Sequence, residues 1–305
     1  MRATVAGAPV SFGVFELTPK GADTVTPDEM VDVLVESGYA GIDLGPAGFL
    51  GEGPALARRL SNAGLELAGG WVQLPFSDDE AFHAALPELD LALRLFSAAA
   101  ESGPSRLPLP TLADAGSPAR RSAPGRGAAL DVPSADAWRR LYANVARAAE
   151  RVRHAGFEPT FHHHAGTYVE SPDEIDRFLA HVDISLTLDT GHLFIAGGNP
   201  SDAVHRWGDR INHLHLKDVD LAELRRVLRA GGGMPEVWAS RSFVPFGRGD
   251  IDLTAVMSAL DEQGYDGWIV VEQDVLNGAD VPLDQFLRDR STDHRQNRDA
   301  LLAWA

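Results

Sequence analysis

Histidines and carboxylates gather in four short stretches in the second half of the chain. The stretches are Phe161–Thr167, Leu188–His192, His213–Asp218 and Val270–Asp274, and six of the eleven histidines fall in the first three. Imidazole nitrogens and carboxylate oxygens suit manganese, iron, cobalt and zinc alike. Two carboxylates balance the charge of a divalent ion, and neutral imidazoles complete its shell. The four stretches therefore predict a site for one divalent metal ion.

Strand geometry decides which of these side chains can meet. Neighbours two apart on a strand share a face, which groups His162 with His164, His213 with His215 and Lys217, and Glu272 with Asp274. A single histidine at a strand end is more often a hydrogen-bonded filler than a ligand, but four such ends in succession argue for convergence. We expect His163 to face the helices and to be structural, and we give no function to the remaining histidines, which are His83, His154, His181, His205 and His294.

Short apolar runs alternate with amphipathic stretches along the whole chain. The runs predict eight strands, at Ala3–Ala8, Gly41–Gly45, Leu65–Val72, Arg106–Leu112, Glu158–His164, Ser185–Asp189, Ile211–Lys217 and Gly267–Asp274. The stretches predict helices at Pro27–Ser37, Pro54–Ala63, Asp78–Ala100, Ala135–Ala155, Pro172–His181, Pro200–Trp207, Leu253–Gln263 and Leu283–Trp304.

Glycine marks the end of several of these helices, at Gly38, Gly64, Gly156 and Gly264. Glycine takes the left-handed conformation of a helix C′ position at little cost. Strand, helix and glycine in repetition indicate a parallel sheet with helical crossovers, and eight units favour closure into a (β/α)8 TIM barrel. We therefore expect one barrel domain over residues 1–305, with its active site at the carboxyl ends of the strands.

Two segments interrupt this alternation. Ser102–Pro133 is rich in proline, glycine, alanine and arginine, and the part after the fourth strand is expected to be a long loop on the active-site face. A cover over the site and simple disorder are about equally expected for it. A second long connection, Arg229–Arg248, follows the seventh strand and contains three consecutive glycines.

Composition excludes several classes of protein. The formal net charge of −17 argues against a nucleic-acid or anionic-membrane partner, because both require basic patches. The absence of cysteine excludes disulfides, iron–sulfur clusters and thiolate zinc sites. No signal-like segment and no run of about 20 apolar residues is evident, so we expect a cytoplasmic protein.

The four strand ends give the chain a resemblance to the xylose-isomerase-like barrel superfamily of sugar isomerases, epimerases and dehydratases. The resemblance is carried by Leu188–His192, by Ile211–Asp218 and by Gly264–Glu272. Within that superfamily the chain is most similar to the inosose dehydratases, through Ala8–Val14 and Phe161–Thr167. Gly41–Pro46 and the segment ending in Gly125-Arg126-Gly127 also fit, so nearly the whole chain takes part.

The resemblance implies that Asp189, His215 and Glu272 are metal ligands. The fourth ligand, on the fifth strand, is a glutamate in many sugar epimerases, whereas here the matching position is His162 or, alternatively, His164. His192 matches a position that contacts substrate. No dinucleotide or other organic cofactor is implied, and among divalent metals manganese is favoured over cobalt, iron and zinc. Relatives often form homodimers, so a homodimer is compatible with the resemblance.

This departure from the epimerases has a mechanistic consequence. Epimerisation beside a ketone uses two carboxylates on opposite faces of the substrate, whereas a histidine on the fifth strand leaves Glu272 as the obvious base. One base and one acid suit dehydration: α-proton removal, an enolate held by the metal, and loss of the β-hydroxyl. His164, His192 or Lys217 could supply the proton to the leaving group, and the sequence does not rank them.

We therefore predict a metal-dependent carbon–oxygen lyase acting on a cyclic keto-polyol such as an inosose. A sugar or hydroxypyruvate-type isomerase or epimerase on the same site is the nearest alternative. A barrel that binds sugar or metal without turnover is a third hypothesis, which the intact Asp189 and Glu272 argue against. No glycine-rich phosphate cradle is evident, which favours an unphosphorylated substrate.

Overall fold

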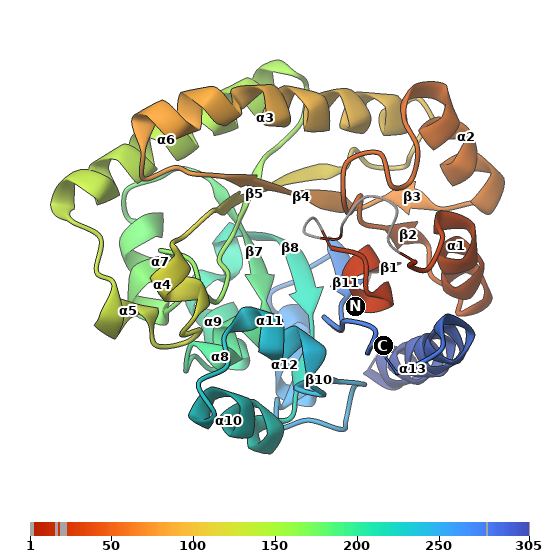
Figure 1. Ribbon diagram of the computed structural model, residues 1–305. Coiled ribbons are helices and arrows are strands. Elements are labelled where there is room, and N and C mark those ends of the chain that lie inside the picture. Colours follow the sequence, from red (N-terminus) through yellow and green to blue (C-terminus); the bar gives the residue numbers. More distant parts are fainter. Residues whose placement is uncertain (1–2, 16–17, 19–22, 279, 305) are drawn as a thin grey trace.

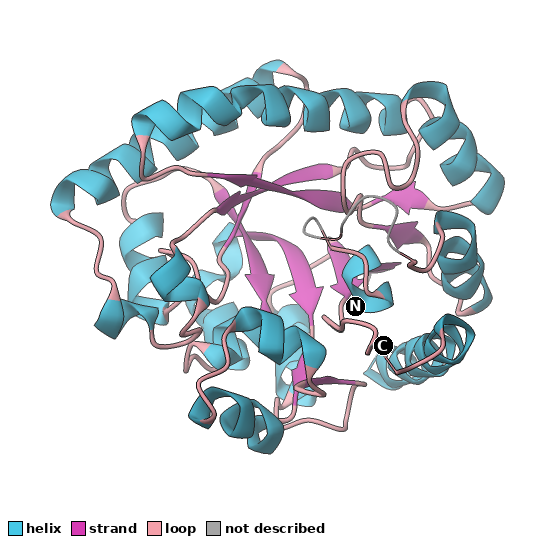
Figure 2. Ribbon diagram, viewed as in Figure 1, coloured by secondary structure: helices cyan, strands magenta, loops and turns pink. Residues whose placement is uncertain are grey.

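A ring of parallel strands forms the centre of the computed structural model, which describes residues 3–15, 18, 23–278 and 280–304. Its strands are β1 (Thr4–Gly7), β2 (Gly41–Ile42), β3 (Glu66–Leu67), β4 (Gly69–Leu74), β5 (Leu109–Asp114), β6 (Thr160–His162), β7 (Ser185–Asp189), β8 (Ile211–Leu216) and β11 (Trp268–Val271). Helices surround the strands on the outside (Figures 1 and 2). The predicted α/β barrel is confirmed.

The sheet closes into a ring where β3 continues into β4. Its order is β3-β2-β1-β11-β8-β7-β6-β5-β4, with every pairing parallel. β3 pairs with β2 and β4 with β5, and only Ala68 separates β3 from β4. The amide of Ala68 donates to the carbonyl of Ile42, and its carbonyl accepts from Leu109. One predicted strand, Leu65–Val72, thus appears as two because each half pairs with a different neighbour.

The predicted helices form with small shifts of their ends. They are α1 (Pro27–Glu36), α2 (Gly53–Ala63), α3 (Asp79–Ala100), α6 (Ala135–His154), α7 (Pro172–Leu179), α9 (Pro200–Trp207), α12 (Leu253–Glu262) and α13 (Leu283–Trp304). The glycines expected to end four of them all have positive φ, with values of 75° (Gly38), 65° (Gly64), 91° (Gly156) and 68° (Gly264). The glycine signals were therefore correctly interpreted.

Several short elements of two to nine residues were not predicted, because most of them are too short to show a periodic pattern. They are the helices α4 (Pro118–Arg121), α5 (Gly127–Leu130), α8 (Thr190–Ile195), α10 (Leu221–Arg229) and α11 (Met234–Ala239), the 3-10 helices η1 (Pro9–Phe12) and η2 (Gly208–Arg210), and the antiparallel pair β9 (Asp218–Val219) and β10 (Phe243–Val244).

The expected long loop after the fourth strand is an ordered cover. α4 and α5 lie in it, and Arg120 of α4 is fully buried beneath them. The Arg120 guanidinium lies 2.9 Å from a carboxylate oxygen of Glu174 and donates to the carbonyls of Asp131 and Thr167. A buried charge with this many partners holds the segment against the barrel. The prediction of a cover is therefore confirmed over that of disorder.

The interior of the barrel changes character along its axis. Trp268, the first residue of β11, packs in a small apolar cluster with Ala6, Ala68 and Val270, and the cluster extends to Ala8 directly after β1. Towards the carboxyl ends of the strands the interior is filled by buried imidazoles, carboxylates and one ammonium group. The apolar cluster supports the barrel, and the polar end forms the site. No helix in the described part of the chain is long and apolar enough to cross a membrane.

His294 differs from our expectation that it would resemble the exposed histidines. It is buried in α13, stacked on Phe12 at 4.8 Å between ring centroids, with its Nδ1 3.1 Å from the hydroxyl of Tyr39. Burial lowers its pKa to about 3. The native ring is therefore neutral at pH values where the unfolded ring, with a pKa of about 6.5, binds a proton.

This difference between the native and unfolded pKa values predicts that the free energy of unfolding decreases as the pH falls. His294 contributes fully above about pH 6.5, and the contribution is lost as the pH falls towards 3, at about 1.4 kcal/mol per pH unit. We expect His294→Leu to reduce that slope in urea unfolding measured from pH 7 to pH 4. The same change at exposed His205 should leave the slope unaltered, and equal slopes for wild type and His294→Leu would contradict the prediction.

Candidate metal centre and active site

Four predicted ligands meet at the carboxyl end of the barrel. His162 is the last residue of β6, Asp189 the last of β7, His215 lies in β8, and Glu272 directly follows β11. His162 Nε2 lies 3.2 Å from His215 Nδ1 and 3.4 Å from Asp189 Oδ2. His215 Nδ1 lies 3.0 Å from Glu272 Oε2. Strands far apart in sequence thus bring two imidazoles and two carboxylates to one point.

The donors fit a divalent ion chemically. Donor atoms of His162, Asp189 and His215 all lie within 4.8 Å of one another, and each residue is buried. Burial lowers the pKa of His162 to about 4, so this ring is neutral and retains a lone pair. Glu272 adds a second carboxylate through its contact with His215 Nδ1. Nitrogen and oxygen donors of this kind bind manganese, iron, cobalt or zinc.

Lys217 places a buried ammonium group among the carboxylates. Its Nζ lies 2.7 Å from Asp189, 2.5 Å from Glu272 and 3.1 Å from Asp274. Burial alone would lower the pKa of Lys217, but the three carboxylates raise it well above the usual value. Burial likewise opposes ionisation of Asp189 and Glu272, yet the cations beside them, Lys217 among them, hold both pKa values well below the usual range.

Asp189 owes its fixed position to its place between a strand and a helix. Its Oδ1 accepts from the backbone amide of His192, 2.8 Å away, and so caps the first turn of α8. Its Oδ2 is left to face Lys217 and the imidazoles. The hydroxyl of Thr190 exchanges hydrogen bonds with the backbone of Lys217, which joins β7 to β8 beside the site. The Asp-Thr-Gly-His sequence is therefore a structural support as well as the source of one predicted ligand.

His164 and His192 lie beside the predicted ligands, in contact with each other. Their ring centroids are 3.6 Å apart, and both residues line the same cavity. His164 Nδ1 lies 2.7 Å from the Ala165 carbonyl, while His192 Nε2 lies 3.5 Å from Asp274. Neither ring nitrogen of His192 has a hydrogen-bond partner among the described residues. Both ring nitrogens of His192 are therefore left to bond a molecule in the cavity.

The interpretation of His163 as structural agrees with its contacts. Its side chain is fully buried, and its Nε2 accepts a hydrogen bond from the backbone amide of Asp189 at 3.1 Å. Burial lowers its pKa well below the usual value, so the ring stays neutral and can accept this bond. His163 thereby helps to hold the end of β7 in place.

Several site residues were not assigned a role from the sequence. They are Asp43 after β2, Trp71 in β4, Arg121 in α4, His213 in β8, Trp238 in α11 and Asp274 after β11. Position alone could have indicated Asp43 and Asp274, because each follows a strand at its carboxyl end. Arg121 and Trp238 come from short helices that the sequence does not reveal.

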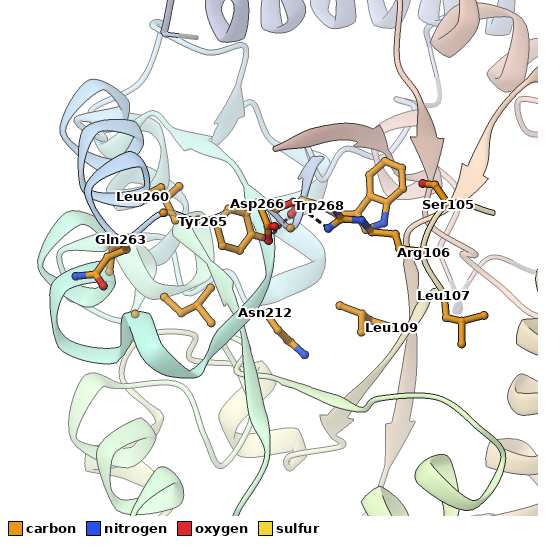
Figure 3. Close-up of a pocket in the computed structure, with 15 residues that line it drawn as sticks. Ser105, Arg106, Leu107, Leu109, Asn212, Leu260, Gln263, Tyr265, Asp266 and Trp268 are labelled. Carbon is orange, nitrogen blue, oxygen red and sulfur yellow. Dashed lines mark hydrogen bonds between the residues drawn. The ribbon is translucent and has the colours of Figure 1, made fainter. Parts of the chain in front are cut away.

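A cavity of about 370 Å³ contains this chemistry. Polar groups of Asp43, His162, His192, His215, Lys217 and Glu272 line it together with the apolar side chains of Phe15, Trp71, Met234 and Trp238. A larger cavity of about 580 Å³ lies at the opposite end of the barrel, where Arg106 bonds the backbone of Asp266 near Trp268 (Figure 3). That cavity gathers no comparable set of ionisable groups. We therefore place the functional site in the smaller one.

Comparison with known sequences identifies relatives over most of the chain. Residues 31–290 match the family model described as xylose isomerase-like TIM barrel. An inosose dehydratase of Geobacillus kaustophilus is 30% identical over 276 residues, covering 87% of this chain and 85% of that protein. The rhizopine catabolism protein MocC of Rhizobium meliloti is 29% identical over 284 residues, covering 89% and 82%.

Solved structures share the fold at lower identity. AsbF of Bacillus anthracis, described as the probable 3-DHS dehydratase of petrobactin synthesis, superimposes with a TM-score of 0.68 at 14% identity, covering 98% of each chain. The IOLI protein, whose structure holds a zinc atom, has a TM-score of 0.72 at 12% identity, covering 99% of this chain and 97% of that one. Identities this low establish the common barrel and nothing finer.

Proposed function

The chain belongs to the xylose isomerase-like TIM barrel family, alongside the inosose dehydratases, and from this premise we propose that it is a metal-dependent dehydratase of a cyclic keto-polyol of the inosose class. The observation that carries the proposal is the unequal distribution of proton-transfer groups around the cavity. Glu272 lies after β11, whereas His164 and His192, which are not among the predicted ligands, come from the segments that follow β6 and β7. A carboxylate base on one side and imidazoles on the other suit elimination better than epimerisation.

The proposed ligands of the ion are His162, Asp189, His215 and Glu272. When bound, a divalent ion would supply a Lewis acid that polarises the substrate carbonyl. Manganese as the native ion and a cytoplasmic location stay predictions. So do the unphosphorylated substrate and the homodimer.

Glu272 is the proposed base. Its contacts with His215 and Lys217 both use Oε2, so Oε1 can take the proton from the carbon beside the carbonyl. Because those neighbours lower its pKa, Glu272 is ionised at neutral pH. Lys217 keeps its proton because three carboxylates surround it, and so it stabilises negative charge without exchanging protons.

His192 is the proposed acid. As the carbon–oxygen bond at the β-carbon breaks, the departing hydroxide takes a proton from the His192 ring and leaves as water. The carboxylate of Asp274, 3.5 Å from His192 Nε2, stabilises the protonated ring before the transfer. Glu272 then holds the substrate proton and His192 has lost one, so both exchange with solvent before the next turnover.

A product analysis tests the proposal. The purified protein, loaded separately with manganese, cobalt and zinc, is incubated with inososes and with ketoses, and the products are examined by mass spectrometry. We expect loss of one water from an inosose. A product of unchanged mass would instead identify an isomerase or epimerase, and no product from any substrate would favour a binding protein.

Trp238 provides a test of substrate recognition. Its indole nitrogen is buried at the cavity, and the described residues offer it no hydrogen-bond acceptor. The Phe15 ring lies 5.0 Å from the Trp238 ring between centroids, and the amide of Leu276 donates to the Trp238 carbonyl. The indole is therefore held in place with a free donor, which suits a hydroxyl of a polyol.

We expect Trp238→Phe to lower kcat/KM for the polyol by about 2- to 10-fold, because a neutral hydrogen bond contributes about 0.5–1.5 kcal/mol. The effect should lie mainly in KM, with metal affinity and melting temperature unchanged. Trp304→Phe, at the end of α13, is the matched control. Unaltered kinetics in Trp238→Phe would show that the indole makes no bond to substrate.

A further inference from the structure

The two ring nitrogens of His215 face two different groups. Nδ1 is directed towards the proposed metal ligands, at 3.0 Å from Glu272 and 3.2 Å from His162. Nε2 has no hydrogen-bond partner among the described residues, and the Oδ2 atom of Asp43 lies 3.4 Å from it. A neutral imidazole has one lone pair and one proton, so a carboxylate beside one nitrogen decides which of the two can bind a metal.

Asp43 is held in place for this contact. It follows β2 directly and is 4% exposed. A Cβ on Gly69 would lie 3.2 Å from Asp43 Oδ1, 3.0 Å from His213 Nε2 and 2.8 Å from the Leu109 carbonyl. Glycine at this position therefore lets β4 approach the carboxylate closely.

His213 covers the other side of the carboxylate. Its ring is fully buried, its Nε2 lies 3.8 Å from Asp43 Oδ1, and neither ring nitrogen has a hydrogen-bond partner in the described part of the chain. At that distance His213 makes no direct bond to Asp43. It excludes solvent from the Asp43–His215 contact and so strengthens that contact.

We propose that Asp43 is a positioning residue of the metal centre, which accepts the Nε2 proton of His215 and leaves Nδ1 as the metal-binding nitrogen. Carboxylates behind metal-binding histidines fix the ring and raise its basicity, and their loss typically weakens metal binding by about 10- to 100-fold. The inference rests on the metal centre of the proposed function and is independent of its substrate.

The same three residues, Asp43, His213 and His215, could instead hold a second ion, because their donor atoms also lie within 4.8 Å of one another. Counting the ring protons distinguishes the two arrangements. Ions at both Nε2 and Nδ1 would need both ring protons of His215 to be displaced, whereas one ion at Nδ1 leaves the Nε2 proton to Asp43. One ion per chain follows from the proposal, and two would follow from the alternative.

Metal binding to the whole chain without substrate tests the proposal. Zinc and manganese are titrated by equilibrium dialysis with elemental analysis, for wild type, Asp43→Asn, Asp43→Ala and the control Asp32→Asn on the exposed face of α1. We expect one ion per wild-type chain, a Kd about 10- to 100-fold weaker in Asp43→Asn, at least as large a loss in Asp43→Ala, and no change in the control. An unchanged Kd, or two ions per chain with one lost in Asp43→Asn, overturns the proposal.

A spectroscopic measurement on the wild type decides the matter even if the variants fold poorly. In 15N-labelled, zinc-loaded protein, long-range 1H–15N spectra distinguish a protonated ring nitrogen from a metal-bound one. We expect His215 to carry its proton on Nε2 and its metal on Nδ1, and the reverse arrangement overturns the proposal. Because neither measurement involves turnover, failure of the dehydratase assignment would leave both results interpretable.

Discussion

Replacing Glu272 by glutamine is expected to lower kcat by about 10²- to 10⁴-fold, the range that a positioned general base contributes. The amide has nearly the same shape but cannot accept the substrate proton. It also leaves Lys217 Nζ and His215 Nδ1 without the carboxylate oxygen that now lies 2.5 Å and 3.0 Å from them. The measurement is the initial rate of water loss at saturating metal and substrate.

Metal binding must be separated from proton transfer in this variant, because Glu272 is also a proposed ligand. The rate is therefore measured over a range of metal concentrations, together with the metal affinity. If excess metal restored the wild-type rate, the role of Glu272 as base would be refuted and only its role as ligand would remain. Glu262→Gln, on the exposed face of α12, should retain full activity.

Replacing Lys217 by methionine is expected to destabilise the metal-free protein by about 3–5 kcal/mol, because it leaves buried carboxylates without their cation. Methionine keeps much of the length of the side chain, so lost packing contributes little. Asp189, Glu272 and Asp274 would then repel one another in a buried site. Their pKa values would rise, and stability would shift towards acidic pH as they take up protons.

A bound divalent ion should offset most of this loss of stability, because it supplies the positive charge that the Lys217→Met substitution removes. Urea unfolding is measured for wild type and Lys217→Met, with chelator and with metal. We expect a large difference between the two proteins in chelator and a small one in metal. Equal differences under both conditions would show that Lys217 acts through packing alone. Arg225→Met, an exposed change on α10, serves as the control.

The barrel and the ligand-bearing strands could be read from the sequence because both depend on local patterns. Alternation along a strand predicts that His162 pairs with His164, and Glu272 with Asp274. All four line the same cavity, although β6 ends at His162 and β11 at Val271. Glycine at Gly38 and the three equivalent helix ends is favoured by backbone sterics alone, and all four adopt the left-handed conformation.

Local patterns did not predict the short helices or the contacts between residues far apart in the chain. The segment that holds α4 and α5 looks like a loop because its order depends on Arg120, whose partner Glu174 lies 54 residues away along the chain. His294 likewise carries no sign of burial, since the Phe12 ring that covers it comes from the other end of the chain.

By itself, then, the sequence determined the residue types at the strand ends, and from these follow the class of ion and the proton chemistry that we propose. Closure of the barrel decided which of those residues touch: it set Lys217 between Asp189 and Glu272, 28 and 55 residues away, and placed Asp43 behind His215. Alternation tells which way a side chain points, but only the packing of strands into a ring sets the distances between side chains on different strands. Those distances, and the exclusion of water around them, fix the charges on which catalysis depends.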